Sequence, residues 1–406
     1  MFRILAVLLI ALTTGTAWAD DAWRLSGFAS LSAGKIQDDE LSYLGYDDEW
    51  SYKGDSVLGL QLSGDLAERL SFNIQALARG VNFEGDEFKP ELEWMFLRYQ
   101  LNSNWRLRAG RMRTPHYLYS ETLDVGYSYV WVRPPVDVYS GTLAPFSHYD
   151  GLDLAYIKDF NDTSLDVQIF TGRMDRKNDN LKVNVNPMLG GNLTLHNGPY
   201  TLRYGLIYNN TDIEVAVSDL FQETLDYYTN FVPEYETLQE AVSTQNAWYR
   251  YQTLGLRWQD YGAAITSEIF EIKNTDSGYS NDAQGWYVSA QIQWGRFTPY
   301  VVTGGYNNEY NQDTLDVIEA SVDAIPLGLD ASFDQFRNGS YYTVMLNNFE
   351  QSTWAVGLRY DVSTNIAIKA EWLDLNFSSR KSRIEPFTVT DLEDTALLTF
   401  VIDVVF

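Results

Sequence analysis

Much of the chain alternates between apolar and polar residues with a period of two. In the segment 284–294 the apolar residues share one face, namely Trp286, Val288, Ala290, Ile292 and Trp294. The other face carries Tyr287, Ser289, Gln291 and Gln293. This pattern predicts β-strands with two unlike faces. A soluble sandwich also alternates, but here the apolar faces often begin or end in Trp, Tyr or Phe, which is typical of strands that face lipid.

Sixteen segments of this kind follow one another along the chain. They lie near 23–33, 56–65, 69–79, 91–101, 105–113, 149–158, 163–173, 187–196, 199–208, 247–258, 261–272, 284–294, 297–306, 350–360, 365–374 and 394–406. Ten residues at about 3.3 Å each, tilted by about 45°, rise about 23 Å, which matches an apolar membrane band of about 25 Å.

The connections between these segments alternate between short and long. After every even-numbered segment the link is short, as at Ala67-Glu68, Asn161-Asp162 and Asn197-Gly198, whereas most odd-numbered segments are followed by long links. An even number of strands lets a sheet close and removes its edges. We therefore predict an all-β fold, a transmembrane antiparallel β-barrel of 16 strands, with short periplasmic turns, long extracellular loops and both termini on the periplasmic side.

Two segments fit this pattern less well. In 91–101, Trp94 and Phe96 share parity with Arg98, and in 247–258, Trp248 shares parity with Arg250. Such mixed faces also occur where a barrel wall meets another subunit instead of lipid.

The first nineteen residues predict a secretory signal peptide. A basic start at Arg3 precedes the apolar run 4–12, and Ala17-Trp18-Ala19 fits the small-x-small rule for cleavage between Ala19 and Asp20. Nine apolar residues are too few to span a bilayer of about 30 Å as a helix. We expect residues 1–19 to be removed and residues 20–406 to form a single outer-membrane barrel domain.

Composition narrows the possible functions. The chain has 29 Lys and Arg against 55 Asp and Glu, which argues against a nucleic-acid surface. It has no Cys and only three His, so thiolate chemistry is excluded, a multi-histidine metal centre is disfavoured, and we expect no cofactor. The 12 Trp, 28 Tyr and 20 Phe are many for so acidic a chain, and an interfacial aromatic girdle would account for them.

Together these features resemble the Gram-negative general porin family: a signal peptide, sixteen amphipathic strands, a long third loop and a last strand that ends in Phe406. The resemblance implies a passive diffusion channel for small hydrophilic solutes or ions, a homotrimer, and a terminal Phe406 read by the barrel assembly machinery. The Pro-Glu-Phe-Gly-type loop motif of enterobacterial porins is absent, which leaves the solute class open.

Several loops are strongly acidic. Loop one (34–55) has seven acids against two Lys, loop five (209–246) has eight acids and no base, and loop seven (307–349) has seven acids and Arg337. These loops form solvated faces, or they bridge through divalent cations to the phosphates of lipopolysaccharide in the outer membrane. Part of loop five also has the composition of one or two short helices.

Loop three (114–149) is the main candidate for function. It carries four Pro and many aromatic residues, too apolar a composition for an exposed loop of this length, and we expect it to fold into the lumen. Its candidate constriction residues are Glu121, Asp124, Arg133 and Asp137.

Arginines on the polar faces of the strands would line the lumen opposite this loop. Arg106 and Arg108 share the face opposite Leu107, and the other candidates are Arg79, Arg203 and Arg359. Arg111 and Arg113 have the opposite parity, so they join this set only if Gly110 forms a bulge or the strand ends there. A basic wall facing an acidic loop would set up a transverse field. Equally, these arginines would pair with the acids and pin the loop.

Two other function classes stay open. In the first, the barrel is a surface scaffold or adhesin whose acidic loops are the active part. In the second, it is a barrel hydrolase that uses His116 or His148, which flank loop three, although no nucleophile or phosphate-binding motif occurs.

Overall fold

The computed structural model describes residues 23–37, 42–82, 86–139, 147–178, 181–215, 236, 245–274, 282–309, 316, 349–379 and 394–406. The predicted signal peptide with its cleavage site at Ala19 and Asp20 lies outside the described residues, as do most of loops five and seven, including the expected helices of loop five.

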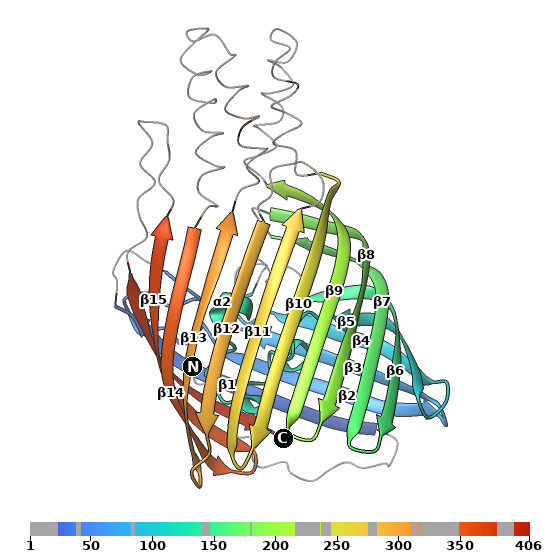
Figure 1. Ribbon diagram of the computed structural model, residues 1–406, viewed down its shortest axis with the longest axis horizontal. Coiled ribbons are helices and arrows are strands. Elements are labelled where there is room, and N and C mark those ends of the chain that lie inside the picture. Colours follow the sequence, from blue (N-terminus) through green and yellow to red (C-terminus); the bar gives the residue numbers. More distant parts are fainter. Residues whose placement is uncertain are drawn as a thin grey trace.

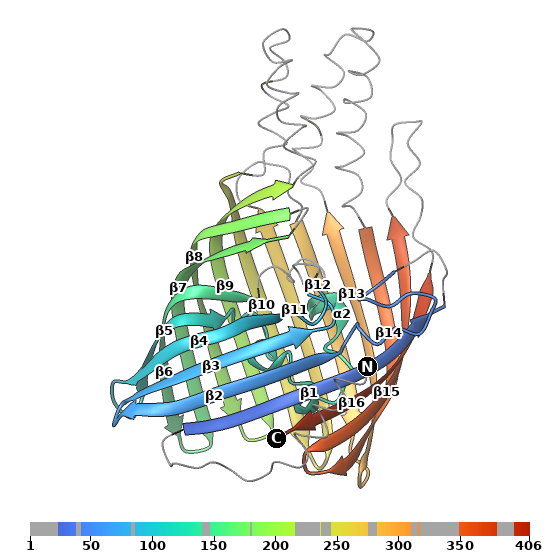
Figure 2. The same ribbon diagram turned by 180° about the vertical axis from the view of Figure 1, so that it is seen from behind.

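The described residues form sixteen strands that pair with their sequence neighbours and close between the first and the last (Figures 1 and 2). The strands are β1 (Trp23–Ile36), β2 (Val57–Ala67), β3 (Leu70–Arg79), β4 (Pro90–Gln100), β5 (Trp105–Arg113), β6 (His148–Phe160), β7 (Thr163–Lys177), β8 (Leu181–Asn197), β9 (Tyr200–Val215), β10 (Ala247–Asp260), β11 (Ala263–Asn274), β12 (Asp282–Ile292), β13 (Phe297–Glu309), β14 (Phe349–Ser363), β15 (Ile366–Ser379) and β16 (Thr395–Val405). The predicted closed antiparallel barrel is confirmed.

The two faces of the wall are those that the alternation predicts. On β12, Trp286 and Val288 are exposed on the outside, whereas Tyr287 and Ser289 are buried on the inside. Apolar outer residues suit contact with hydrocarbon, and inner polar residues suit a lumen. We call the end that carries the turns after the even-numbered strands, each of two to four residues, the short-turn end; it is the lower end in Figure 1, where the C-terminus also lies.

Several strands are longer than the sequence pattern indicates. β7 continues to Lys177, and β8 and β9 extend over Leu181–Asn197 and Tyr200–Val215. The outward residues of the added part of β7, Asp175 and Lys177, are charged and exposed. A search for apolar alternation therefore ends before the strand does.

The expected bulge or strand end at Gly110 is wrong. β5 runs on to Arg113 without a register shift, and Gly110 has a φ of +133°, a conformation that glycine adopts most readily. A Cβ on Gly110 would lie 2.2 Å from the Met95 carbonyl oxygen, so the strands approach unusually closely here. The bulge lies instead on β4, where the pairing with β3 shifts between Gln75 and Ala76.

This bulge explains the mixed face of β4. Trp94 pairs with Gln75 and Phe96 with Asn73, so both aromatic residues take the inward face. Phe96 is buried there beneath the Arg108 guanidinium, 5.4 Å from its ring centroid. On β10 the mixed face is the outward one, where Arg250 pairs with Glu271 at 3.4 Å.

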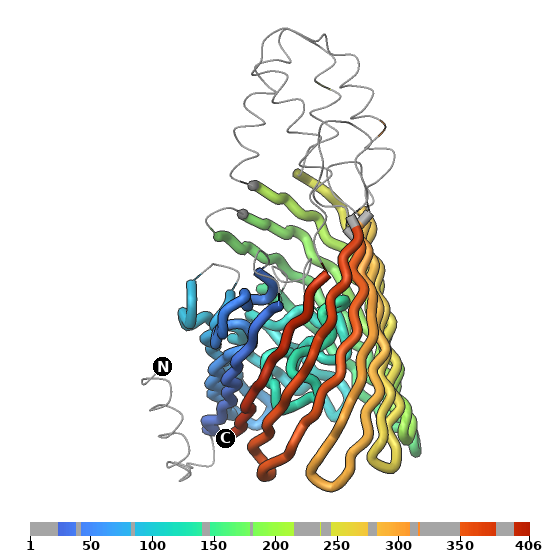
Figure 3. Tube along the Cα trace, turned by 90° about the vertical axis from the view of Figure 1, so that its left-hand side faces the viewer, coloured from blue at the N-terminus to red at the C-terminus, as the bar shows by residue number. Residues whose placement is uncertain are grey.

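Loop three folds into the barrel, as predicted. Its described part, Thr114–Tyr139, lies inside the ring of strands (Figure 3) and contains two 3-10 turns, η1 (Ser120–Thr122) and η2 (Gly126–Ser128), and the single-turn helix α2 (Val136–Tyr139). α2 packs against β11, β12, β13 and β14. Among the described residues, no helix has the length and apolar character needed to cross a membrane.

Candidate functional site in the barrel lumen

Loop three is attached to the wall of β10–β16 by buried polar side chains. Glu268 on β11 accepts hydrogen bonds from the Leu118 backbone N–H at 2.8 Å, from the Tyr287 hydroxyl at 2.8 Å, and from the Tyr139 hydroxyl. Trp131 is almost fully buried and donates its indole N–H to Ser289 at 2.8 Å. These bonds satisfy polar groups that would otherwise be costly to bury.

Arg133 joins loop three to three other parts of the chain. Its guanidinium donates to Asp55 of loop one at 2.6 Å, to Glu371 on β15 at 3.0 Å and to Thr399 on β16 at 2.6 Å. Burial alone would lower the pKa of Arg133, but the carboxylates of Asp55 and Glu371 raise it well above its ordinary value. Arg133 is therefore a buried, permanently charged residue that holds loop three to loop one, β15 and β16.

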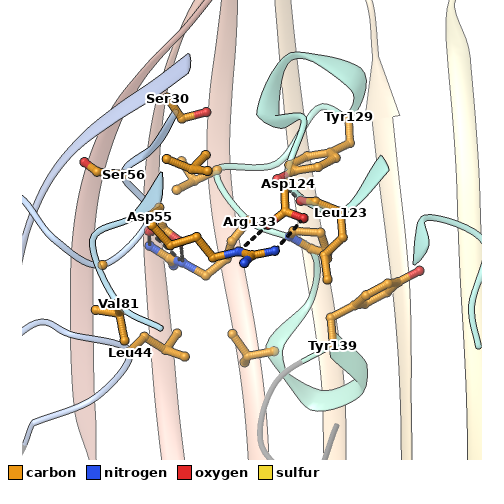
Figure 4. A pocket seen from close by; sticks show the side chains of 16 residues that line it. Ser30, Leu44, Asp55, Ser56, Val81, Leu123, Asp124, Tyr129, Arg133 and Tyr139 are labelled. Carbon is orange, nitrogen blue, oxygen red and sulfur yellow. Dashed lines mark hydrogen bonds and ion pairs between the residues drawn. The ribbon is translucent and has the colours of Figure 1, made fainter. Parts of the chain in front are cut away.

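The contact between Arg133 and Asp55 shows that loop one is not simply a solvated face. Figure 4 shows Asp55, Ser56 and Leu44 on one side of a cavity of about 190 Å³, and Leu123, Asp124 and Tyr139 of loop three on the other. Tyr46 of loop one is buried and donates to Asp55 at 2.7 Å. Part of loop one thus folds over loop three.

A buried lysine holds the centre of loop three. Lys369 on β15 donates to the carbonyl oxygens of Gly126 and Trp131, each at 2.6 Å, and lies 2.9 Å from Asp403 on β16. Asp403 also accepts a 2.5 Å hydrogen bond from Ser30 on β1.

The opposite wall reaches loop three through ion pairs. Asp124 binds the Arg79 guanidinium at 2.8 Å and also pairs with Arg113, and Glu93 lies 2.8 Å from Arg79. Burial would raise the pKa of Asp124, but the two guanidinium groups hold it well below its usual range. Arg79, predicted to line the lumen, therefore pairs directly with loop three. Arg113 does so as well although it has the outward parity of β5, because it is the last residue of that strand.

Arg108 and Glu121 form a looser contact. Arg108 is buried and binds Asp153 on β6 at 2.7 Å, while its distance to Glu121 is 3.4 Å. The Glu121 side chain is 54% exposed, so this acid of loop three faces open lumen.

Arg106 and Arg203 have no carboxylate within ion-pair distance in the described part of the chain. Arg203 donates to the Thr194 hydroxyl at 3.0 Å and to the Pro115 carbonyl at 2.9 Å. Arg106, Arg203 and Glu121 are all close enough to Asp166 on β7 to act on its charge. These four groups surround one stretch of lumen beside loop three.

The remaining candidates have other surroundings. Arg359 donates to the carbonyl oxygens of Tyr127 and Tyr129 at 2.8 Å and pairs with Asp361 at 2.9 Å. Arg111 binds Asp150 at 2.8 Å on the outward parity of β5 and β6, because the next pair, Met112 and Tyr149, is the buried inward one. Arg111 therefore does not face the lumen, and the prediction that it lines the lumen is wrong.

Asp137 on α2 is buried without a cation among the described residues around it. It accepts a hydrogen bond from Gln351 at 3.0 Å and another from Thr353. Burial raises the pKa of Asp137 to about 6, and the two hydrogen bonds offset only part of this effect.

Apolar–polar alternation does not single out the wall acids and the lysine that hold loop three. Glu268, Glu371, Lys369 and Asp403 all sit at inward positions of their strands and are buried. A charged residue on the inward face of a strand could have been noticed from the sequence. The period-two pattern does not say which residue it pairs with.

A model of the Gram-negative porin family matches residues 6–389. The chain belongs to the Gram-negative porin family. It is therefore an outer-membrane channel, and the lumen described above is the interior of a porin. No curated protein matches its sequence significantly.

Solved structures share the fold of this porin at low sequence identity. The outer membrane channel DcaP of Acinetobacter baumannii is 10% identical, with a TM-score of 0.57 over 96% of this chain and 99% of that one. The anion-selective porin from Comamonas acidovorans is 14% identical, with a TM-score of 0.55 over 95% and 99%. OmpT of Vibrio cholerae, in a form that lacks loop L8, is 10% identical, with a TM-score of 0.56 over 95% and 99%.

Proposed function

We propose that this porin is a passive diffusion channel for small hydrophilic solutes and ions, with loop three as its constriction. The observation that carries the proposal is the fastening of loop three across the lumen by buried ion pairs and hydrogen bonds from both walls. A loop held in this way narrows the lumen at a fixed place. Flux would follow the solute gradient, and the protein would add no catalysis.

The charges that act on a passing solute are, in this proposal, those that remain accessible beside loop three. Glu121 lies on the loop side, and Arg106 and Arg203 lie on the wall. Arg79, Arg108, Arg113, Arg133, Arg359, Asp124 and Asp137 mainly hold the loop in shape. In our proposal, the predicted transverse field therefore arises from Glu121 on one side and from Arg106 and Arg203 on the other.

A hydrolase mechanism has little support from the histidines. His116 is buried, burial lowers its pKa to about 3, and Arg203 adds to this effect, so the ring is neutral and makes no hydrogen bond to described residues. The Nδ1 atom of His148 lies 3.2 Å from the Ser147 hydroxyl but also 3.3 Å from the Arg176 guanidinium, which disfavours an imidazolium there. Neither ring is arranged as a general base.

We further propose the orientation and partners of the barrel. Residues 1–19 would direct export and be removed, and the short-turn end with both termini of the mature chain would face the periplasm. Phe406, whose backbone pairs with Gly27 at 2.8 and 2.9 Å, would be read by the barrel assembly machinery. A homotrimer, with outer loops facing lipopolysaccharide, completes this proposal.

The test is single-channel conductance of the folded protein in a planar bilayer, with the reversal potential measured under a salt gradient. Stepwise conductance is expected. An Arg106→Glu variant should move the reversal potential toward cation selectivity, because it replaces an accessible positive charge at the constriction with a negative one.

The matched control is Arg111→Glu, which makes the same charge change on the outward face and should leave the reversal potential unchanged. Absence of conductance would contradict the channel proposal and favour a surface scaffold or adhesin. Equal shifts in the two variants would show that the Arg106 position has no special access to the solute path.

A further inference from the structure

A polar pocket lies beneath loop three, toward the short-turn end of the lumen. It has a volume of about 170 Å³ and is lined by the 3-10 segment of loop three and by β10–β14, including Arg257, Gln259, Gln291, Gln293, Thr298 and Arg359. The volume equals that of about six water molecules at ~30 Å³ each, which suits a compact solute. The pocket is separate from the constriction formed by Arg106, Arg203 and Glu121.

Arg257 distinguishes this pocket from the rest of the lumen. Its guanidinium donates to the Tyr119 hydroxyl and, at 2.6 Å, to the Gln259 side-chain oxygen. No carboxylate lies within ion-pair distance of Arg257 in the part of the chain that the structure describes. Both partners are neutral, so the positive charge is held in a fixed position and is not cancelled. A planar guanidinium of this kind matches the geometry of a carboxylate.

The other lining groups add hydrogen-bonding capacity with little charge. Arg359 is neutralised by Asp361 at 2.9 Å, so the pocket keeps a net charge of about one positive unit at Arg257. Gln291, Gln293 and Thr298 supply amide and hydroxyl groups, which donate to and accept from hydroxyls. The rings of Tyr119 and Tyr129 bound the side formed by loop three.

We propose that this pocket binds a small hydroxylated carboxylate, such as a sugar acid, on its way through the lumen. The carboxylate would meet Arg257, and the hydroxyl groups would meet Gln291, Gln293 and Thr298. A neutral sugar would make the second set of contacts only, and a simple anion the first set only.

Isothermal titration calorimetry of the folded protein in detergent with sodium gluconate tests this proposal. Gluconate should give saturable heat, and glucose, which has the hydroxyls without the carboxylate, should bind about tenfold more weakly or not at all. This proposal rests on the proposed channel function, but calorimetry needs no conduction, so a failure of binding and a failure of conductance are distinguishable: absent binding contradicts this proposal alone, and absent conductance contradicts passage through the lumen.

The sharpest variant is Gln259→Glu, which places a carboxylate at 2.6 Å from Arg257 with almost no change in shape. It should lower gluconate affinity about tenfold, because the guanidinium then has an internal partner. Gln293→Glu, at the exposed rim, gives a second test that leaves the contacts of Arg257 in place, and it should also weaken binding. Arg98→Gln removes an equal charge from the lumen face of β4 outside the pocket and should change the affinity less than twofold.

Three results would overturn the proposal. The first is no saturable heat from gluconate up to about 10 mM, a very weak affinity by any measure. The second is equal binding of glucose and gluconate, which would remove the role of the carboxylate. The third is an equal loss of affinity in Arg98→Gln and Gln259→Glu, which would indicate general electrostatics in place of a site.

Discussion

The lumen contains two groups of arginines that the sequence does not separate. Those of the first group end on carboxylates and help to hold loop three: Arg79, Arg108, Arg113 and Arg133. Those of the second group end on neutral acceptors or have no ion pair to described residues: Arg98, Arg106, Arg203 and Arg257. The residue type and its parity place an arginine in the lumen, but its partner determines whether it fastens the loop or leaves a charge for a solute.

Most members of the two groups also differ in position along the barrel. Arg98, Arg106, Arg203 and Arg257 all lie within five residues of a short turn. Arg108 of the first group also lies within five residues of a short turn, whereas Arg79 and Arg113 lie at the opposite ends of their strands and Arg133 lies on loop three itself. The unpaired positive charges therefore lie toward the short-turn end of their strands, where Arg108 is the member of the first group that lies among them. The following experiments test this division.

The largest effect is expected for Arg133→Ala. This change leaves Asp55 and Glu371 without their cation, and breaking a buried pair by removing one partner costs about 3–5 kcal/mol. Chemical unfolding, followed by the electrophoretic mobility of the unheated barrel, should show this loss, whereas Arg98→Ala should stay within about 0.5 kcal/mol. Similar losses in both variants would remove the distinction between the two groups.

The second largest effect is expected from the ionisation of Asp137, which helps to hold loop three without a cation among the described residues around it. Because burial raises its pKa to about 6 from an ordinary value of 3.8, the docked loop should be most stable below about pH 4. This stability should decline as the pH rises through 6, with a total loss of about 3 kcal/mol.

Hydrogen exchange of the amides of residues 130–139, measured between pH 4 and pH 8, would report this change. In the Asp137→Asn variant the new side chain cannot ionise. After correction for intrinsic exchange rates, the protection of the backbone amides of residues 130–139 should therefore be independent of pH. A pH-dependent loss of protection that persists in the variant would assign the effect to another group.

The smallest change in stability is expected for Glu121→Gln. The Glu121 side chain is 54% exposed, and exposed ion pairs contribute about 0–1 kcal/mol. Its reversal potential should nevertheless move toward anion selectivity. Asp124→Asn should show the reverse profile, with a clear loss of stability because Arg79 and Arg113 lose a shared carboxylate. An equal loss of stability in Glu121→Gln and Asp124→Asn would contradict the distinction between an accessible charge and a charge that holds loop three.

The fold was largely predictable because a barrel wall repeats one rule. All sixteen strands follow from period-two alternation and from the short turns, and the errors fall where that rule stops operating. β9 reaches Val215 because strands continue beyond the lipid, and Phe96 turns inward because one extra residue at Glu93 shifts the parity of β4.

The site was less predictable because its contacts join distant parts of the chain. Arg133 could be named from loop three alone, but Asp55 and Glu371 are 78 and 238 residues away from it. Parity identifies Glu371 as an inward residue, yet nothing local says which loop residue it will meet. Arg106 was the easier case, because its role in our proposal depends on the wall and not on a partner.

The group formed by Ser30, Asp403 and Lys369 joins the closing seam of the barrel to loop three. Ser30 belongs to the first strand and Asp403 to the last, so these side chains meet only after the two ends of the sheet have joined. Lys369, paired with Asp403, donates to the backbone carbonyl oxygens of loop three at Gly126 and Trp131. The carboxylate of Asp403 is therefore shared between the seam that closes the barrel and the lysine that holds loop three.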